Sequence, residues 1–250
     1  MTPTPRMLYV HDDLTDEVRE RHGADSDAFR GVQALLALVA RDTRRVRILT
    51  LEEQLGALTR GHRVPFAVAV GIGRAGERVA RRVHARTGWF PLIERVELTR
   101  EEQGDGYVLS TLGKPPLDVQ LAPVAAAGSI AVVDDTIFSG LTMMAALKAL
   151  PPGARARTHA FCLRAVEESL ADVATLCPAS AGFVATGRLL EDVSFINASG
   201  LVRRGAIRRV GRPPLAFYER PEWMRAWFGP DAADVTARCA ALARALDGAG

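Results

Sequence analysis

The sequence predicts an α/β fold in which a central, mainly parallel sheet is flanked by helices. Three observations predict it: strand patterns alternate with helical ones along the chain, the connections between them are short, and glycine-rich or acidic segments follow the buried strands. With 250 residues, 48% of them hydrophobic and 24% charged, the chain can bury one sizeable core. We therefore expect a single domain over residues 1–250 with an α/β core over about 45–165.

The first half of this pattern alternates helix and strand. Residues 25–40 carry apolar side chains at helical spacing, and residues 45–49 predict a short strand. Residues 65–70 are a continuous apolar run of strand length, which is typical of a strand buried on both faces. A glycine-rich turn over residues 71–76 and a helix over 77–86 are expected to follow.

The second half repeats the alternation. Residues 92–98 predict a strand, and residues 100–116, which contain glycines and charges without a period, predict a long mobile loop. Residues 129–133 predict a buried strand, 141–150 a helix, and 158–163 a further strand. Ligands of such parallel sheets lie at the carboxyl ends of the strands.

The ends of the chain differ in character from this core. Residues 183–250 hold short apolar pieces, a cluster of arginines, an aromatic segment over 214–229 and a final amphipathic helix over about 231–246. Residues 1–44 and 183–250 are therefore candidate appended elements.

Composition excludes several classes of protein. No segment reaches the ~18 uninterrupted apolar residues of a membrane span, and the first residues lack the apolar region of a secretory signal, so we expect a cytoplasmic protein. Cys162, Cys177 and Cys239 lack the close spacing of zinc or redox pairs. The net charge of +3 is small, which makes nucleic acid an unlikely partner.

The most informative segment is IAVVDDTIFSGLT, residues 130–142. Asp134 and Asp135 follow a buried strand, where an ionised carboxylate costs several kcal/mol unless it faces water or a polar ligand. The next residues supply hydroxyl groups and a glycine at the start of a helix, where free backbone N–H groups attract a phosphate. Carboxylates for sugar hydroxyls and a phosphate site are thus expected side by side.

This segment resembles the motif that binds phosphoribosyl pyrophosphate (PRPP) in type I phosphoribosyltransferases. The resemblance implies that Asp134 and Asp135 hold the ribose hydroxyls, directly or through Mg²⁺. It implies a 5-phosphate site built from Thr136, Ile137, Phe138, Ser139, Gly140, Leu141 and Thr142. The other interpretation, an acidic turn that only caps a helix, predicts neither the apolar strand nor the spacing of the hydroxyls.

Two positions depart from the family motif. Thr136 replaces a position that is commonly aliphatic, and Phe138 replaces the aspartate that usually faces the purine in enzymes that salvage 6-oxopurines. Since Phe138 cannot accept a proton or a hydrogen bond there, ordinary hypoxanthine or guanine salvage is disfavoured. An apolar or stacked acceptor is favoured instead.

The glycine-rich turn has two competing functional interpretations. Its six residues are Gly71, Ile72, Gly73, Arg74, Ala75 and Gly76. They satisfy the dinucleotide fingerprint, with Glu94 or Glu97 ~20 residues further on as the ribose-binding acid. The family resemblance instead implies the turn that binds pyrophosphate, where small residues let the backbone approach and Arg74 adds charge-assisted hydrogen bonds. A purely structural turn is the third possibility.

The family resemblance also assigns roles to the loop and to the ends of the chain. Residues 100–116 would close over PRPP, with Arg100 and Lys114 as candidates to neutralise the departing pyrophosphate. Residues 1–44 and 183–250 would form the variable hood at the acceptor site. The acceptor candidates are Phe138, Phe195, Tyr218, Trp223, Arg203 and Arg204. Aromatic residues at such spacing are more often found in a core or a dimer contact. We assign no metal to His11 and its acidic neighbours.

The sequence thus predicts a type I phosphoribosyltransferase that is Mg²⁺-dependent and homodimeric. It would transfer the 5-phosphoribosyl group of PRPP to a small aromatic or anionic acceptor and release pyrophosphate. No residue stands out as a general base. Two alternatives stay open: an NAD(P)-dependent oxidoreductase that uses residues 71–76, and a non-catalytic regulator that senses PRPP.

Overall fold

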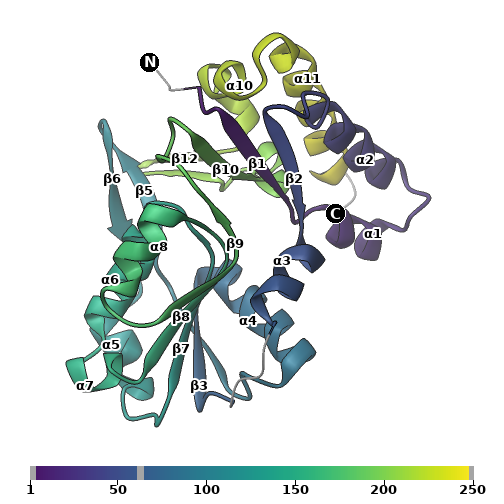
Figure 1. Cartoon of the computed structure of the whole chain (residues 1–250). Helices are drawn as coiled ribbons and strands as arrows, with labels where there is room; N and C mark the ends of the chain where they lie inside the picture. The colour runs from purple at the N-terminus through teal and green to yellow at the C-terminus, as the bar shows by residue number, and fades with distance from the viewer. Residues whose placement is uncertain (1–3, 61–64, 248–250) are drawn as a thin grey trace. The chain divides into compact units, whose positions relative to one another are not determined.

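The computed structural model describes residues 4–60 and 65–247, and the chain divides into two compact units (Figure 1). The central unit is Glu52–Gly187, and the terminal unit combines Met1–Leu51 with Arg188–Gly250. Each unit has its own cluster of buried apolar side chains. The predicted core over 45–165 therefore differs at both ends, because residues 46–50 form a strand of the terminal unit and the central unit continues to Gly187.

A five-stranded parallel sheet forms the middle of the central unit, which confirms the predicted fold class. The strand order is β4-β3-β7-β8-β9, and every neighbouring pair is parallel. The strands are β3 (Val68–Ile72), β4 (Ile93–Val96), β7 (Ile130–Ile137), β8 (Thr158–Val166) and β9 (Ala179–Ala185). The continuous apolar runs of β3 and β7 suit this position, since both faces of a parallel sheet are covered.

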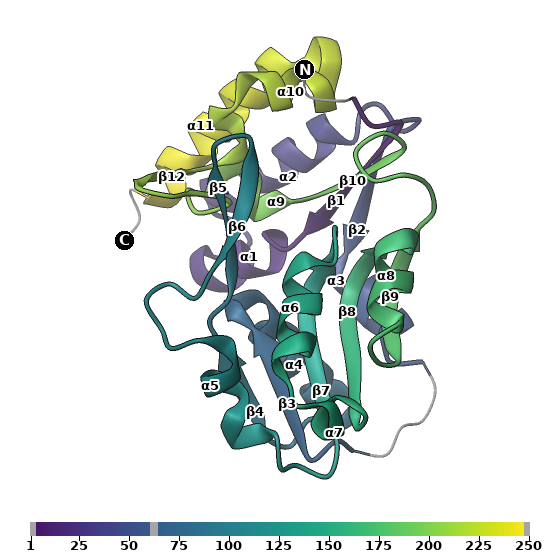
Figure 2. The ribbon, with the colours of Figure 1, turned by 90° about the vertical axis from the view of Figure 1, so that its left-hand side faces the viewer.

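Helices cover both faces of this sheet because the chain crosses it in two directions. It passes from β3 to β4 towards one edge and from β7 through β8 to β9 towards the other, so right-handed crossovers place α4 on one face and α6 and α8 on the opposite face (Figures 1 and 2). The helices of the unit are α3 (Leu51–Leu58), α4 (Gly73–Thr87), α5 (Leu117–Leu121), α6 (Leu141–Ala149), α7 (Pro152–Arg155) and α8 (Glu167–Ala174), with a 3-10 turn at Ala122–Val124.

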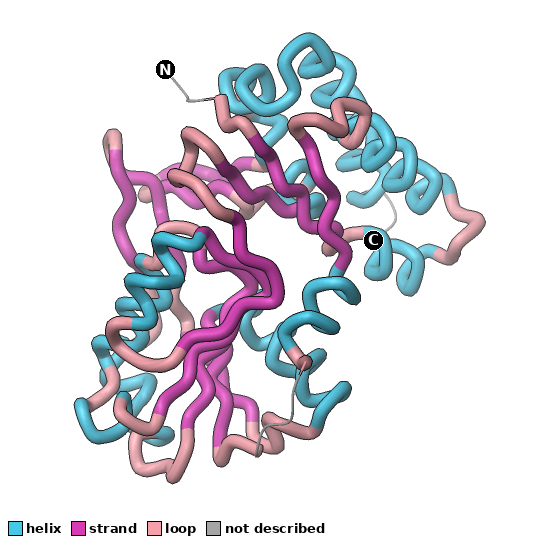
Figure 3. Tube along the Cα trace, in the orientation of Figure 1, coloured by secondary structure: helices cyan, strands magenta, loops and turns pink. Residues whose placement is uncertain are grey.

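The segment that we expected to be a long loop contains a β-hairpin. Strands β5 (Thr99–Gln103) and β6 (Gly106–Ser110) pair antiparallel, with Gln103 opposite Gly106 (Figure 3). The tight turn between them contains Gly104 at φ +59°, a conformation that glycine adopts without strain. The charged composition hid the hairpin, because backbone pairing does not require an apolar period. Closure of this segment over a ligand stays a prediction.

The terminal unit is built on a three-stranded parallel sheet of order β10-β1-β2. These strands are β1 (Met7–Asp12), β2 (Val46–Thr50) and β10 (Val193–Asn197), and a short hairpin pairs β11 (Ile207–Arg209) with β12 (Arg212–Leu215). The helices are α1 (Thr15–His22), α2 (Asp27–Val39), α9 (Ala198–Val202), α10 (Pro221–Phe228) and α11 (Ala232–Asp247), with 3-10 turns at Phe217–Glu219 and Gly229–Asp231. None of the helices in the described ranges could cross a membrane.

Close packing of α4 on the central sheet requires two glycines, Gly71 in β3 and Gly76 in α4. A Cβ atom on Gly71 would lie 2.3 Å from the backbone nitrogen of Glu77, and one on Gly76 would lie 2.2 Å from the carbonyl oxygen of Val133. Both obstacles are backbone atoms, which cannot rotate away. The start of α4 therefore lies directly against β3 and β7.

Gly76→Ala is expected to lower the free energy of unfolding by about 1–3 kcal/mol, because the new methyl group overpacks the contact between α4 and β7. Urea denaturation measures this change. Gly128→Ala is the matched control, since nothing lies within 4 Å of a Cβ there, and it should change stability by less than about 0.5 kcal/mol. Equal stability of the two variants would contradict the close packing.

Candidate functional site

The two motifs found in the sequence meet at the carboxyl edge of the central sheet. Strands β3 and β7 are neighbours, and Gly71 lies opposite Val133. The glycine-rich segment and the acidic pair therefore leave adjacent strands at the same edge. The chain also reverses its direction across the sheet between these two strands. Such a switch point is where open parallel sheets bind their ligands.

The glycine-rich segment is the end of a strand and the first turn of a helix rather than a separate turn. Helix α4 begins at Gly73, four residues earlier than expected, and Gly73 itself has φ +57°. The glycines suggested a loop, but Gly71 and Gly76 serve close packing instead. The first N–H groups of α4 lack partners within the helix, and they give this end a positive partial charge. Arg74 lies in this first turn and is exposed.

The acidic pair lies within β7 rather than after it. The strand continues to Ile137, because β8 extends alongside it and pairs Asp134 with Cys162 and Thr136 with Arg164. Asp134 is only 8% exposed, and its Oδ1 accepts a hydrogen bond of 2.8 Å from the backbone nitrogen of Asp135. The side chain of Asp135 is 21% exposed and is the more accessible of the two.

Arg164 on β8 is a site residue that the sequence analysis missed. Its side chain is completely buried, and its Nη2 donates a hydrogen bond of 3.0 Å to Oδ2 of Asp135. A buried guanidinium needs such a partner, because desolvation of an unpaired charge is costly. The signal was present in the sequence, since an arginine interrupts the apolar run of β8, FCLRAV.

The electrostatics of the site disfavour a second negative charge on the pair. Burial raises the pKa of Asp134 well above its ordinary value, and the neighbouring carboxylate of Asp135 raises this pKa further. Arg164 acts in the opposite direction and lowers this pKa, while its ion pair is with Asp135. The site can therefore stabilise an additional positive charge beside Asp134.

A short loop connects β7 to α6 in the region predicted to bind phosphate. Thr136 and Ile137 end β7, and α6 begins at Leu141 after Gly140, which has φ +73°. The hydroxyl of Ser169 on α8 donates a hydrogen bond of 2.7 Å to the carbonyl oxygen of Phe138 and so holds the loop in place. The N-cap residue of α6 is Gly140, which has no side chain to cap the helix. The first N–H groups of this helix can therefore donate to an anion.

Of the two basic candidates near the hairpin, the structure places one at this loop. The guanidinium of Arg100 lies 4.8 Å from the centre of the Tyr107 ring and 6.0 Å from that of Phe138. This is cation–π geometry, so the base of the hairpin is in contact with the loop. Lys114 is exposed, and its backbone nitrogen donates a hydrogen bond to the carbonyl oxygen of Thr111.

The remaining acceptor candidates belong to the terminal unit and take part in its packing. The Phe195 ring lies 5.3 Å from that of Tyr9, and the Trp223 ring lies 5.9 Å from that of Phe217. Tyr218 packs against the apolar cluster of this unit. Their role in acceptor binding stays a prediction.

The two arginine candidates of the terminal unit form ion pairs. Arg203 pairs with Glu17 at 2.6 Å, and Arg204 pairs with Glu219 at 2.7 Å. Each pair balances the charge that would otherwise attract an anionic acceptor. A role of either arginine at an acceptor therefore requires that it leave its present partner.

The acidic side chains at the end of β1 accept hydrogen bonds from nearby backbone groups. His11 lies in β1 and is buried. Asp12 accepts from the backbone nitrogen of Thr15 at 2.9 Å, and Asp13 accepts from the backbone nitrogen of Ser199 at 2.8 Å. Within the described part of the chain, no three His, Cys, Asp or Glu side chains form a group that could hold a metal ion.

No known protein family and no curated protein matches the sequence. Among solved structures, the chain is similar to a hypothetical protein from Neisseria gonorrhoeae with bound ppGpp (17% identity, 68% of this chain and 83% of that one, TM-score 0.36). It is also similar to a purine phosphoribosyltransferase from Pyrococcus horikoshii (15%, 67% and 88%, TM-score 0.32) and an orotate phosphoribosyltransferase from Aeropyrum pernix (16%, 61% and 70%, TM-score 0.32). The last two belong by name to the family that residues 130–142 resemble.

Asp134→Asn is expected to raise the free energy of unfolding at pH 8, because it removes a buried negative charge and keeps the oxygen that accepts from Asp135. A carboxyl group whose pKa is raised by folding destabilises the folded protein when it ionises. This penalty is absent below the ordinary pKa of about 3.9 and grows as the pH rises towards the raised pKa. The gain should therefore disappear as the pH falls to about 3. Urea denaturation across this pH range measures it.

Asp135→Asn is the matched control and should have the opposite sign at pH 8. It removes the ionic partner of a completely buried arginine, so it should lower the free energy of unfolding by about 3 kcal/mol. Equal changes in the two variants would contradict the assignment of Asp135 as the ionised partner of Arg164.

Proposed function

We propose that the chain is a Mg²⁺-dependent phosphoribosyltransferase that uses PRPP as glycosyl donor. One observation carries the proposal: the acidic pair of β7 and the glycine-rich start of α4 lie on adjacent strands at the switch point of a parallel sheet. The loop before α6 follows the same acidic pair and offers N–H groups to a phosphate. A sugar with a phosphate at one end and a pyrophosphate at the other matches this order of groups.

Each group of the donor is assigned to one element. The carboxylates of Asp134 and Asp135 would bind the ribose hydroxyls, and the ion pair with Arg164 would hold Asp135 in position. The N–H groups at the start of α6 would bind the 5-phosphate. The start of α4, with Arg74, would bind the pyrophosphate and stabilise its charge as it departs.

The donor set of the site fits Mg²⁺. This ion prefers oxygen ligands and is usually held by one or two carboxylates together with the oxygens of a phosphate substrate. Asp134 and Asp135 supply the carboxylates, and a cation there would offset the repulsion that raises the pKa of Asp134. When bound, the ion would neutralise charge on the pyrophosphate as the glycosidic bond breaks.

The acceptor is proposed to be small and either anionic or easily deprotonated. No side chain in the described part of the central site is placed as an obvious general base, and such an acceptor would need none. Phe138, with Arg100 over its ring, would present an apolar face to an aromatic acceptor. The hairpin that carries Arg100 would exclude water from the activated sugar.

The dinucleotide alternative is weakened by the surroundings of Glu97, one of its two acidic candidates. Glu97 follows β4, as the fingerprint requires, but its carboxylate is paired with Arg95 at 2.9 Å. A ribose would have to displace this ion pair. The regulator alternative predicts that PRPP binds without release of pyrophosphate, so a measurement of turnover separates it from the enzyme.

PRPP with Mg²⁺ is expected to raise the melting temperature of the wild type by about 5–10 °C at 100 times its Kd. The double variant Asp134→Asn/Asp135→Asn should lose this shift, because it removes both carboxylates that would bind the ribose and the cation. Asp118→Asn, an exposed carboxylate on α5, is the control and should keep it. Stabilisation by NAD or NADP without any effect of PRPP would overturn the proposal.

Release of pyrophosphate on addition of acceptors then tests turnover. We expect release with at least one aromatic or carboxylate-bearing acceptor in the wild type, and at least a hundredfold less in the double variant. Binding of PRPP without release for any acceptor would instead support the regulator.

A further inference from the structure

One face of the hairpin formed by β5 and β6 combines an arginine with exposed apolar side chains. Arg100 lies directly opposite Leu109, and Glu102 lies opposite Tyr107. Residues that lie opposite each other, or two apart along a strand, project from the same side of a sheet, so these four side chains share one face. Tyr107 is 49% exposed and Leu109 is 40% exposed. We call this surface the hairpin face.

Arg100 joins the hairpin face to the loop between β7 and α6. Its guanidinium lies 4.8 Å from the centre of the Tyr107 ring and 6.0 Å from the centre of the Phe138 ring. The hydrogen bond from Ser169 holds the carbonyl oxygen of Phe138 in place. The exposed ring of Tyr107 is therefore connected through one side chain to the loop that follows the acidic pair.

The ring contacts leave Arg100 able to bind a carboxylate. An arginine that packs against aromatic rings keeps its five N–H donors at the edge of the guanidinium plane. The interactions of the Arg100 guanidinium with the described residues are the two ring contacts, and no ion pair is among them. A carboxylate matches the guanidinium edge with two parallel hydrogen bonds. Because the rings already restrain the side chain, less conformational entropy is lost when a ligand binds.

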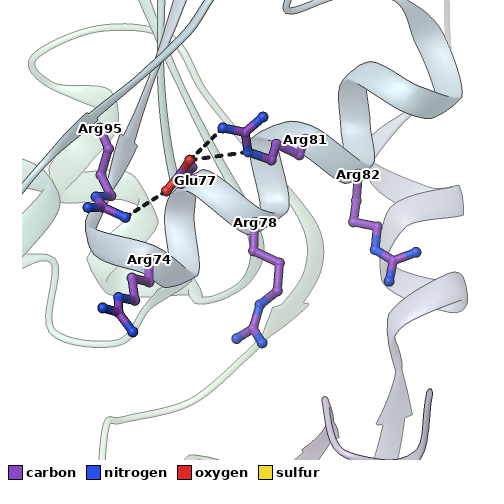
Figure 4. Close-up of a pocket in the computed structure, with 6 residues that line it drawn as sticks. All are labelled: Arg74, Glu77, Arg78, Arg81, Arg82 and Arg95. Carbon is purple, nitrogen blue, oxygen red and sulfur yellow. Dashed lines mark hydrogen bonds and ion pairs between the residues drawn. The ribbon is translucent and has the colours of Figure 1, made fainter. Parts of the chain in front are cut away.

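The arginines of α4 and β4 are less suited to this role. They line a pocket on the exposed side of α4 (Figure 4). The lining residues are Arg74, Glu77, Arg78, Arg81, Arg82 and Arg95. Arg81 and Arg95 donate hydrogen bonds to Glu77, and Arg78 and Arg82 have interaction partners of their own. The remaining arginine of the pocket is the one that we assign to the pyrophosphate.

Glu102 determines where on the hairpin face an anionic group can bind. It lies opposite Tyr107, at the end of the hairpin that carries the turn, and it has interaction partners of its own. A carboxylate of the ligand would be repelled at this end and attracted at the other end, where Arg100 and Leu109 lie opposite each other. The charged group of a ligand is therefore expected at Arg100.

We propose that the hairpin face is the acceptor subsite of the proposed transferase and that it selects a planar aromatic ring bearing a carboxylate. Arg100 would bind the carboxylate, and the exposed part of the Tyr107 ring would stack on the acceptor beside Leu109. The proposal rests on the proposed function, because it places the acceptor next to the loop between β7 and α6. It assigns Arg100 to the acceptor rather than to the departing pyrophosphate. It also replaces Arg203 and Arg204 in this role, since both are already paired.

A saturation-transfer NMR titration of the full chain with benzoate, in the presence of PRPP and Mg²⁺, tests the proposal. Benzoate carries both features that the hairpin face would recognise. Benzamide has the ring without the charge, and cyclohexanecarboxylate has the charge without the aromatic ring. Both should therefore bind at least about fivefold more weakly than benzoate.

Two variants should weaken the binding of benzoate, and two matched controls should not. Arg100→Gln removes the charge and should raise Kd at least about tenfold. Tyr107→Leu removes the ring, keeps an apolar side chain and should raise Kd about fivefold. Arg86→Gln removes an exposed arginine that pairs with Glu52 at 2.8 Å, and Val108→Thr alters the opposite face of β6, so both should stay within about twofold of the wild type. Melting temperatures verify that all four variants are folded.

The response to PRPP distinguishes a failure of this proposal from a failure of the proposed function. PRPP with Mg²⁺ should still raise the melting temperatures of Arg100→Gln and Tyr107→Leu, because neither change removes a proposed contact with the donor. If the wild type shows no such shift, the transferase itself is wrong. If the shift is present but benzoate binds both variants as tightly as the wild type, or binds no better than benzamide or cyclohexanecarboxylate, the acceptor subsite alone is wrong. Loss of the PRPP shift in Arg100→Gln with unchanged binding of benzoate would return Arg100 to the pyrophosphate and also overturn the subsite.

Discussion

The ion pair between Arg164 and Asp135 is the interaction on which the carboxyl edge of the central sheet depends. The arginine is completely buried within β8, so it must keep a negative partner, and the partner lies on the neighbouring strand. β7 and β8 stay paired past the acidic pair, up to Ile137 opposite Ala165. The ion pair also places a cation next to Asp134, whose own charge is disfavoured by burial. A single buried guanidinium thus fixes the position of the Asp135 carboxylate and adds a positive charge beside the acidic pair.

A second constraint is the absence of side chains where α4 meets the sheet. Gly71 and Gly76 allow the start of α4 to touch the backbone of β3 and β7, next to the strand residue that precedes Asp134. Any larger residue would move the positive end of the helix away from the carboxylates. The ion pair and the glycine contact therefore act together, since one fixes the acids and the other fixes the basic end of the site beside them.

The sequence predicted those parts of the molecule that local pattern determines. The apolar runs of β3 and β7, the position of α6 and the location of the candidate site residues near strand ends all follow from short segments. The partner of Arg164 could not be predicted, because Asp135 lies 29 positions away and only the strand register brings the two together. The pairing of β1 with β10 was missed for the same reason, since it joins opposite ends of the chain. The hairpin of β5 and β6 was hidden by charged residues that pair through their backbone.

The charges of the central site are separated in a way that constrains its ligand. The acidic pair lies on β7, whereas the starts of α4 and α6 carry the positive partial charge of helix N-termini. A simple anion would gain from the helix ends but would be repelled by the carboxylates, and a simple cation would meet the reverse. A ligand that carries phosphate groups together with hydroxyls or a bound cation interacts favourably with both regions. This separation is the physical reason for proposing a phosphorylated sugar, rather than an isolated anion, at the switch point between β3 and β7.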